Sequence, residues 1–346
     1  MSVLVMSLRG VVRGIGSITL AILFAFTSVP ALSQGAANPA DVMARAEQGD
    51  ADAQQAVGVM YQMGQGVAPD VTEAVRWYTM AAEQGHAMAQ LNLGMMYNFG
   101  MGLQQDYVEA VKWFELAGEQ GLMVAQANLG MIYANGQGVT QDMAAAAKWY
   151  GMAAEQGDLN AQLYLAEMYF LGQGIPQDFE QAGKWYRLAA DQGDAAAQYS
   201  LATMHLSGQG VAEDGDEAAA LFARAADQGH FSAMYSLGVM YEEGQGVAQD
   251  YTQAVRWYRE AASQGYFNAQ NNLGILYGNG QGVEQNSLRA GMWLNVAAKL
   301  AFGEQREQIQ QNRDNMIATL NEEQAAEAQR LADLCIESNY RTCDSN

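Results

Sequence analysis

The stretch RWYTMAAEQGH, residues 76–86, contains two adjacent aromatic residues followed by two alanines and a Gln-Gly pair. Closely related segments begin at positions 112, 148, 184 and 256, and a weaker copy, ALFARAADQGH, begins at position 220. The period is therefore 36 residues. Periods of roughly 20 to 50 residues are typical of solenoids and repeat arrays, so the repeat has to be interpreted before any single residue is given a chemical role.

Each repeat has the pattern of two antiparallel helices. The first helix has the form A-Q-x-x-L-G-x-M-Y, as in AQLNLGMMY at residues 89–97, and the second contains the aromatic pair. Gly-x-Gly pairs such as Gly64 and Gly66 separate the two helices, because glycine adopts left-handed backbone angles without a steric penalty. The pattern predicts an all-α protein of about seven stacked 36-residue helix pairs.

An aspartate precedes the second helix in six of the seven repeats. In five of them Glu or Gln follows three residues later, as Glu73 follows Asp70, which is the spacing of a capping box. General acids or calcium ligands are the alternative interpretation, and the local partner favours capping. These aspartates are Asp70, Asp106, Asp142, Asp178, Asp214 and Asp250.

All six tryptophans occupy one column of the second helix, and Leu221 fills the remaining repeat. The spacing places Ala74, Trp77 or Tyr78, and Ala81 on one helix face. An aromatic residue that recurs once per helix pair predicts packing between helices rather than a ligand-binding aromatic box. The column contains Trp77, Trp113, Trp149, Trp185, Trp257 and Trp293.

Residues 1–33 have the organisation of a cleavable signal peptide. They contain two arginines and no acidic residue, and they include a short apolar run from Ile18 to Phe26. Cleavage is expected after Ala31 or after Ser33, and a retained anchor helix is the alternative. We therefore expect a periplasmic or secreted protein with no membrane span after cleavage.

The charge balance excludes some partners. The formal net charge is −21, and removal of the signal peptide leaves 15 Lys and Arg against 38 Asp and Glu. Such a chain repels phosphate backbones and anionic lipids, so no nucleic-acid binding is expected.

The only cysteines, Cys335 and Cys343, lie near the C-terminus. In an exported protein this pair predicts a disulfide, which would stabilise the fold by roughly 2.5 kcal/mol. A metal pair or redox couple is the alternative, but the CxxC spacing is missing and no histidine lies nearby.

Catalytic and metal-ligating residues are scarce. His205 falls in a column of tyrosines and is expected in the core, whereas His86 and His230 share the position after Gln-Gly four repeats apart. Helices pack roughly 8 to 10 Å apart, so this separation does not allow a zinc triad. No serine has a GxSxG setting with a nearby base. We predict no enzyme activity, no cofactor and no metal site.

The segment AMYSLGVMYEEGQGVAQDYTQAVRWYREAASQG, residues 233–265, resembles the Sel-one-like repeat (SLR), a relative of the tetratricopeptide repeat. The resemblance covers residues 50 to about 300. It implies a right-handed α-solenoid with a concave groove for protein or peptide partners and no built-in active site. Exported bacterial members act as adaptors, regulators of envelope signalling and host-interaction proteins. A secreted cysteine-rich subgroup is credited with β-lactam binding and hydrolysis, but it has a cysteine pair in each repeat, which this chain lacks.

Four segments follow from these patterns. Residues 1–33 are the signal peptide, 34–49 an N-terminal half-repeat cap, 50–302 the repeat solenoid, and 303–346 a helical C-terminal cap with the disulfide. The predicted function is a non-enzymatic exported scaffold or adaptor, with an envelope enzyme or binder of cell-wall or β-lactam substrates as the alternative.

The tetratricopeptide resemblance implies that residues of the first helix line the concave face. Counted from the small residue in the middle of that helix, these are the residue three positions before it and the residues one, four and five positions after it. These columns do not recur along the chain, whereas the packing columns hardly vary. The groove is therefore expected to bind an extended segment with apolar anchors and basic flanks, although ordinary contacts between first helices are the alternative. The predicted groove residues are Leu91, Met95, Phe99, Leu163, Phe170, Leu171, Tyr199, Leu206 and Tyr235.

Overall fold

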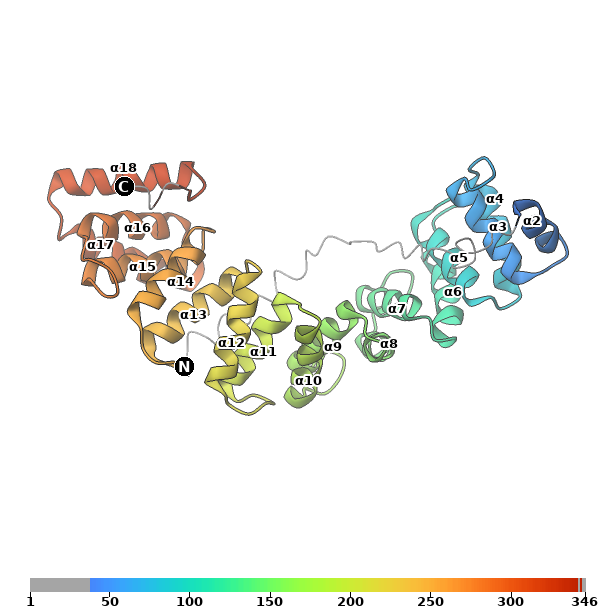
Figure 1. Ribbon diagram of the computed structural model, residues 1–346, viewed down its shortest axis with the longest axis horizontal. Helices are drawn as coiled ribbons and strands as arrows, with labels where there is room; N and C mark the ends of the chain where they lie inside the picture. The colour runs from blue at the N-terminus through green and yellow to red at the C-terminus, as the bar shows by residue number, and fades with distance from the viewer. Residues whose placement is uncertain (1–37, 342, 344–346) are drawn as a thin grey trace. The chain divides into compact units, whose positions relative to one another are not determined.

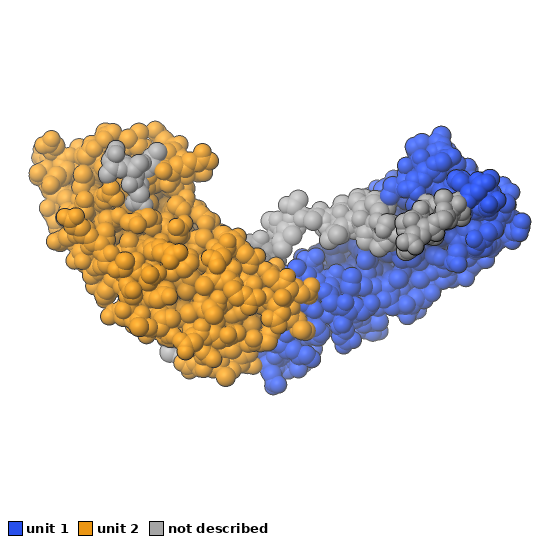
Figure 2. Space-filling view, in the orientation of Figure 1, with its two compact units in different colours: residues 1–185 blue, residues 186–346 orange. Residues whose placement is uncertain are grey.

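The computed structural model describes residues 38–341 and 343, and this part of the chain contains helices and no strand. Within these described residues, seventeen α-helices follow one another from α2 (Pro39–Glu47) to α18 (Glu322–Glu337) (Figure 1). The predicted all-α class and the stacking of helix pairs are confirmed. The chain forms two compact units, residues 1–185 and 186–346 (Figure 2), which are described separately below. The predicted signal peptide, residues 1–33, lies outside the described residues.

Unit 1 begins with α2, which packs against the first helix pair. Each pair consists of two helices of 13 residues, and its two helices make extensive contact with each other. The pairs are α3 (Ala51–Met63) with α4 (Val71–Glu83), α5 (Ala87–Phe99) with α6 (Tyr107–Glu119), and α7 (Met123–Asn135) with α8 (Met143–Glu155); α9 (Leu159–Leu171) and the first part of α10 (Phe179–Asp191) follow.

Unit 2 contains the end of α10, three further pairs and the C-terminal helices. Helix α16 contacts both α17 and α18, so the two last long helices cover the final pair. The elements are α11 (Ala195–Ser207) with α12 (Gly215–Asp227), α13 (Phe231–Glu243) with α14 (Tyr251–Ala262), α15 (Phe267–Asn279) with α16 (Ser287–Leu300), the short η2 (Gly303–Gln305), α17 (Arg306–Ile317) and α18.

The predicted aspartate caps are confirmed, but the reciprocal half of the capping box is wrong. Oδ1 of Asp70 accepts hydrogen bonds from the backbone N–H groups of Thr72 and Glu73 at 3.0 and 3.1 Å. The carboxylate of Glu73 pairs with Arg76, while the backbone N–H of Asp70 donates to the carbonyl of Tyr61 at 2.9 Å. Because the N–H of Asp70 already donates to the preceding helix, it is not available to the carboxylate of Glu73.

The glycine turns adopt the predicted left-handed backbone. Gly64 has φ +68° and ends α3, where its N–H donates to the carbonyl of Met60. Two residues later Gly66 has φ +77°. A side chain at either position would be strained, which explains why both stay glycine.

The adjacent aromatics of the second helix both belong to the core but pack against different neighbours. Trp77 clusters with Ala46 of α2 and Val57 of α3. Tyr78 lies over Gly58, where a Cβ atom would approach Cε1 of the ring to 2.5 Å. The tyrosine column therefore requires the small residue in the middle of the first helix. The tryptophan column is not uniformly buried, since the side chains of Trp113 and Trp257 are partly exposed.

Glutamines connect neighbouring helices through buried hydrogen bonds. Nε2 of Gln54 donates to the carbonyl of Ala46 at 3.1 Å, and Nε2 of Gln84 donates to Oε1 of Gln54 at 2.7 Å. The same pair recurs at Gln120 with Gln90, Gln156 with Gln126, and Gln228 with Gln198. Gln54 of α3 thus connects the C-terminal end of α2 with the C-terminal end of α4.

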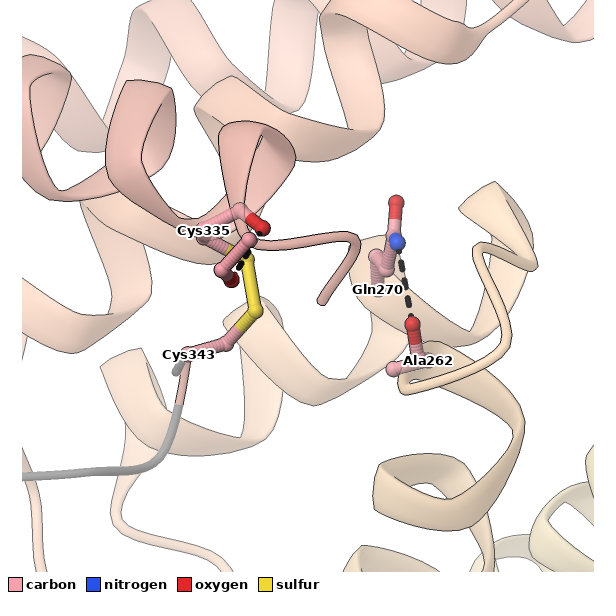
Figure 3. The surroundings of a disulfide bond; sticks show 5 residues. Ala262, Gln270, Cys335 and Cys343 are labelled. Atoms are coloured by element: carbon pink, nitrogen blue, oxygen red, sulfur yellow. Dashed lines mark hydrogen bonds between the residues drawn. A yellow bond between two sulfur atoms is a disulfide. The ribbon is translucent and has the colours of Figure 1, made fainter. Parts of the chain in front are cut away.

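The chain end is fastened near the last repeats. Cys335 on α18 forms a disulfide with Cys343, with 4.7 Å between their Cα atoms, and both residues are buried (Figure 3). The ring of Tyr340 lies against Gly265, in the turn that precedes α15. In the same region the amide nitrogen of Gln270 points to the carbonyl of Ala262 (Figure 3).

Candidate partner-binding site

The structure places the predicted groove residues on the first helices, but it leaves none of them fully exposed. Leu91 and Tyr199 are buried, and Leu91 packs in a cluster with Phe114 and Trp149. These two side chains contact neighbouring helices and offer little accessible surface. The other seven are partly exposed: Met95, Phe99, Leu163, Phe170, Leu171, Leu206 and Tyr235.

In unit 1 the partly exposed face of α9 combines apolar side chains with one carboxylate. Leu163, Glu167 and Phe170 lie at i, i+4 and i+7, so they share one side of the helix. Burial raises the pKa of the Glu167 carboxyl above its usual range. The ring of Phe170 meets that of Phe179 edge-on, with 5.2 Å between their centroids. A half-buried carboxylate beside apolar groups suits a partner that brings both a cation and apolar side chains.

In unit 2 aromatic rings form a continuous series that we call the aromatic row. Successive centroids along it lie 4.8, 6.1, 5.3, 6.2 and 5.1 Å apart. Tyr235 joins the row through Tyr266, at 5.2 Å. The row consists, in order, of Tyr199, His230, Phe231, Tyr266, Phe267 and Phe302.

The row arises where each second helix ends and the next first helix begins. His230 and Tyr266 are the N-cap residues of α13 and α15, and Phe231 and Phe267 are the first residues of these helices. Nδ1 of His230 accepts a hydrogen bond from the backbone N–H of Ala233 at 3.2 Å. Helix geometry therefore holds each ring pair at the same place in successive repeats.

Sequence reasoning missed five members of the row, His230, Phe231, Tyr266, Phe267 and Phe302. The aromatic pair directly after Gln-Gly, QGHF at 228–231 and QGYF at 264–267, would have found all of them except Phe302. In unit 1 the corresponding positions contain no aromatic pair. They are Asp50 with Ala51, His86 with Ala87, Leu122 with Met123, and Asp158 with Leu159.

Two members of the row are clearly open to solvent. Phe231 is 46% exposed and Phe302 is 71% exposed, whereas Tyr266 and Phe267 are partly exposed. Neighbouring exposed aromatic side chains are unusual on a monomer and mark interaction surfaces when they gather. The row is therefore the strongest candidate surface of unit 2.

The carboxylates nearest to Phe231 in sequence, one before and one after it, differ in their separation from it. Glu242 lies at the far end of α13, eleven residues after Phe231, where the hydroxyl of Tyr258 donates to it. Burial raises the pKa of the Glu242 carboxyl. Asp227 is exposed three residues before His230.

Three cations close in sequence to these turns already have partners. Lys299 pairs with Asp333, and Nη2 of Arg224 donates to the carbonyl of Ala190 at 3.0 Å. Nη2 of Arg259 donates to the hydroxyl of Tyr277 at 2.9 Å. These contacts direct three of the nearby positive charges to other groups.

His205, predicted in the core, is buried there. Its Nδ1 lies 2.9 Å from the carbonyl oxygen of Ala212, and its Nε2 lies 2.7 Å from Nη2 of Arg187. Within residues 38–341 and 343, no three His, Cys, Asp or Glu side chains are grouped as metal ligands. In the same residues, every helix is too short or too polar to cross a membrane.

Stacked helix pairs of constant length with a partly exposed face define a helical-repeat scaffold. The Sel1 repeat family model matches seven segments, which together make up more than half of the chain. The chain therefore belongs to the Sel1 repeat family. The matched segments are residues 51–86, 87–122, 124–158, 159–194, 195–230, 231–266 and 268–302.

Two solved structures resemble the chain over most of its length. A Sel1 repeat protein from Oxalobacter formigenes is 37% identical, with 79% of each chain covered and a TM-score of 0.56. A protective antigen of uropathogenic Escherichia coli strains, which displays an SLR fold, is 27% identical, with 89% of each chain covered and a TM-score of 0.52. No curated protein matches the chain.

Proposed function

We propose that the protein is an exported, non-enzymatic scaffold that binds a protein or peptide partner through the first helices of its Sel1 repeats. Residues 34–49 and 303–346 act as the two end caps of this scaffold. Sel1 repeats generally mediate protein–protein interaction and are typically non-catalytic, which supports this proposal. A role in regulating the cell envelope is the form of this function that we favour.

One observation supports this function above the others. The packing positions hold the same residue types in repeat after repeat, as Tyr78 and Tyr150 show, and these side chains are buried. The first-helix face changes instead, for example from Met95 to Glu167 at equivalent positions, and both side chains are partly exposed. Packing requires constant residues, whereas a surface that recognises one extended partner can differ at each repeat.

Two observations support export. The buried disulfide between Cys335 and Cys343 is typical of proteins from oxidising compartments. The relative from uropathogenic Escherichia coli strains is a protective antigen, which fits an exported protein. Both agree with the signal peptide predicted for residues 1–33.

The test is affinity capture from an envelope extract with the purified chain. Replacing Leu163 and Phe170 together by alanine should abolish capture of the recovered partner, because both contribute to the partly exposed face of α9. Leu116→Ala is the matched control, since Leu116 is an exposed apolar residue of a second helix. Capture that survives Leu163→Ala/Phe170→Ala and is lost in Leu116→Ala would place the binding surface on the second helices.

The alternative function, an envelope enzyme or binder of cell-wall or β-lactam substrates, has its own direct assay. The chain is incubated with peptidoglycan and with a panel of β-lactams, and the products are analysed by mass spectrometry. Turnover of either substrate would replace the scaffold proposal.

A further inference from the structure

The aromatic row of unit 2 combines exposed rings with an exposed carboxylate. Phe231 and Phe302 are the most exposed rings, and the exposed Asp227 ends α12, four residues before Phe231. Residues 186–341 contain 20 Asp or Glu against 10 Lys or Arg, so the surroundings of the row are strongly acidic. A ligand for this surface has to supply positive charge together with groups that pack on aromatic faces.

We propose that the aromatic row binds an extended, arginine- or lysine-containing segment of a partner protein, whose cations lie over the rings and pair with the neighbouring carboxylates. This inference rests on the proposed function and assigns it a place and a ligand chemistry. Cations are attracted to the faces of aromatic rings, and the attraction increases where water is partly excluded. The protein already uses this contact internally, since the guanidinium of Arg256 lies 4.9 Å from the ring centroid of Trp257.

The dimensions of the row suit an extended chain. Neighbouring centroids from Phe231 to Phe302 lie 5.1 to 6.2 Å apart. Side chains on one side of an extended strand recur about every 7 Å, so successive same-side residues of a bound segment meet successive rings. A compact ligand would cover one ring pair and leave the others in water.

The polar groups beside the row favour a cation over a sugar. Phe231, Phe267 and Phe302 have no polar atom in their side chains, so they offer no hydrogen bond to a sugar hydroxyl. Asp227, three residues before His230, is an exposed carboxylate that can pair with a bound cation.

The test uses the purified chain without residues 1–33 and a fluorescein-labelled peptide of ten alternating arginine and proline residues. Proline keeps this probe extended. A second peptide with citrulline in place of arginine retains the shape and removes the charge. An oligosaccharide of six N-acetylglucosamine units is added as a competitor.

The double variant Phe231→Ala/Phe302→Ala separates ring contacts from general attraction to an acidic chain, because it keeps every charge. Each lost ring contact should weaken binding about two- to fivefold, so the double variant should bind the arginine peptide about four- to twenty-five-fold more weakly. Phe302→Ala alone should show about a two- to fivefold loss. The control Leu334→Ala, which removes an exposed apolar side chain from α18, should bind like the wild type.

Several results would overturn the inference. These are no binding of the arginine peptide, equal binding of the citrulline peptide, wild-type affinity of Phe231→Ala/Phe302→Ala, or displacement by the oligosaccharide, which would assign the row to glycans. Far-UV circular dichroism and thermal melting verify that the variants are folded. If Leu163→Ala/Phe170→Ala loses the captured partner while the ring variant keeps it and binds the peptide normally, the proposed function stands and this inference fails. If neither variant affects capture, the proposed function itself fails.

Discussion

Nε2 of Gln156 donates a 2.7 Å hydrogen bond to Oε1 of Gln126, thirty residues earlier in the sequence. Gln126 in turn donates to the carbonyl of Gly118 at 2.9 Å, so one buried side chain joins the ends of α6 and α8. The pattern changes at Met234, which offers Gln264 only a thioether sulfur at 3.5 Å. Hydrogen bonds to sulfur are weak, so the glutamine contact is weakest in this repeat.

Gln126→Leu should destabilise the chain by about 1 to 3 kcal/mol, because it removes two hydrogen bonds, one to the carbonyl of Gly118 and one from the amide of Gln156. Both groups keep one other partner in Gly121. The measurement is a urea melt followed by circular dichroism. Met234→Gln is the matched reverse change, since it introduces the side chain that the other repeats have, and it should stabilise unit 2 by about 0.5 to 1.5 kcal/mol. If the two substitutions shift stability in the same direction, the glutamine contacts do not stabilise the repeats.

Trp149→Ala should cost about 3 to 5 kcal/mol, because the side chain is buried in a cluster with Phe114 and Leu129. Trp257 is partly exposed, so Trp257→Ala should cost less and serves as the control. Both values come from denaturant melts. A loss below about 1 kcal/mol for Trp149→Ala would show that this ring does not contribute to the core.

The double variant Cys335→Ser/Cys343→Ser should lose roughly 2 to 3 kcal/mol, because the unfolded chain regains the freedom that the nine-residue loop removes. In the exported protein, reduction should raise the intact mass by two hydrogen atoms. The same spectrum gives the mature N-terminus, which we expect at or near Gln34. Two free thiols in protein from the periplasm, or a retained segment 1–33, would contradict the compartment assignment.

Burial lowers the pKa of the His230 imidazole. In the unfolded chain a histidine has a pKa of about 6.5, so just below this pH the unfolded state binds a proton that the folded state does not bind. Stability should therefore decrease as the pH falls below about 6.5 and stop decreasing below the folded pKa. Protonation also removes the Nδ1 acceptor that caps the N–H of Ala233.

Thermal melts between pH 7.5 and 5 measure this dependence. His230→Asn keeps an N-capping side chain without a titrating ring, so it should flatten the curve. His86→Asn changes the equivalent N-cap residue in unit 1 and is the control. In this variant the decrease of stability with falling pH that His230 causes should remain. An unchanged curve in His230→Asn would show that another group titrates.

The repeat length, the helix pairs and the aspartate caps were predictable from local sequence, because each depends on contacts within one repeat. The carboxylate of Asp70 accepts from backbone N–H groups two and three residues later. The 36-residue period determines which residues occupy equivalent positions in successive repeats. The return contact of Glu73 was not predictable, because the N–H that it would meet donates to Tyr61 of the preceding helix.

For the candidate site, the sequence identified a variable first-helix face but not which of its side chains are accessible. Tyr199 and Tyr235 belong to the same column, yet Tyr199 is buried and Tyr235 is partly exposed. Burial depends on the residues that neighbouring helices supply, since the ring of Tyr199 meets Phe222 and His230. This information does not lie within one repeat.

By itself, the sequence determined the architecture, since a 36-residue period with fixed small, aromatic and capping positions is compatible with one way of packing helix pairs. Only the tertiary structure decided that rings after Gln-Gly in successive repeats form a row. Tyr266 meets Phe231, 35 residues earlier, because stacking brings equivalent helix starts side by side. Secondary structure fixes the direction of a side chain along its own helix, whereas packing between repeats decides which distant side chains it contacts.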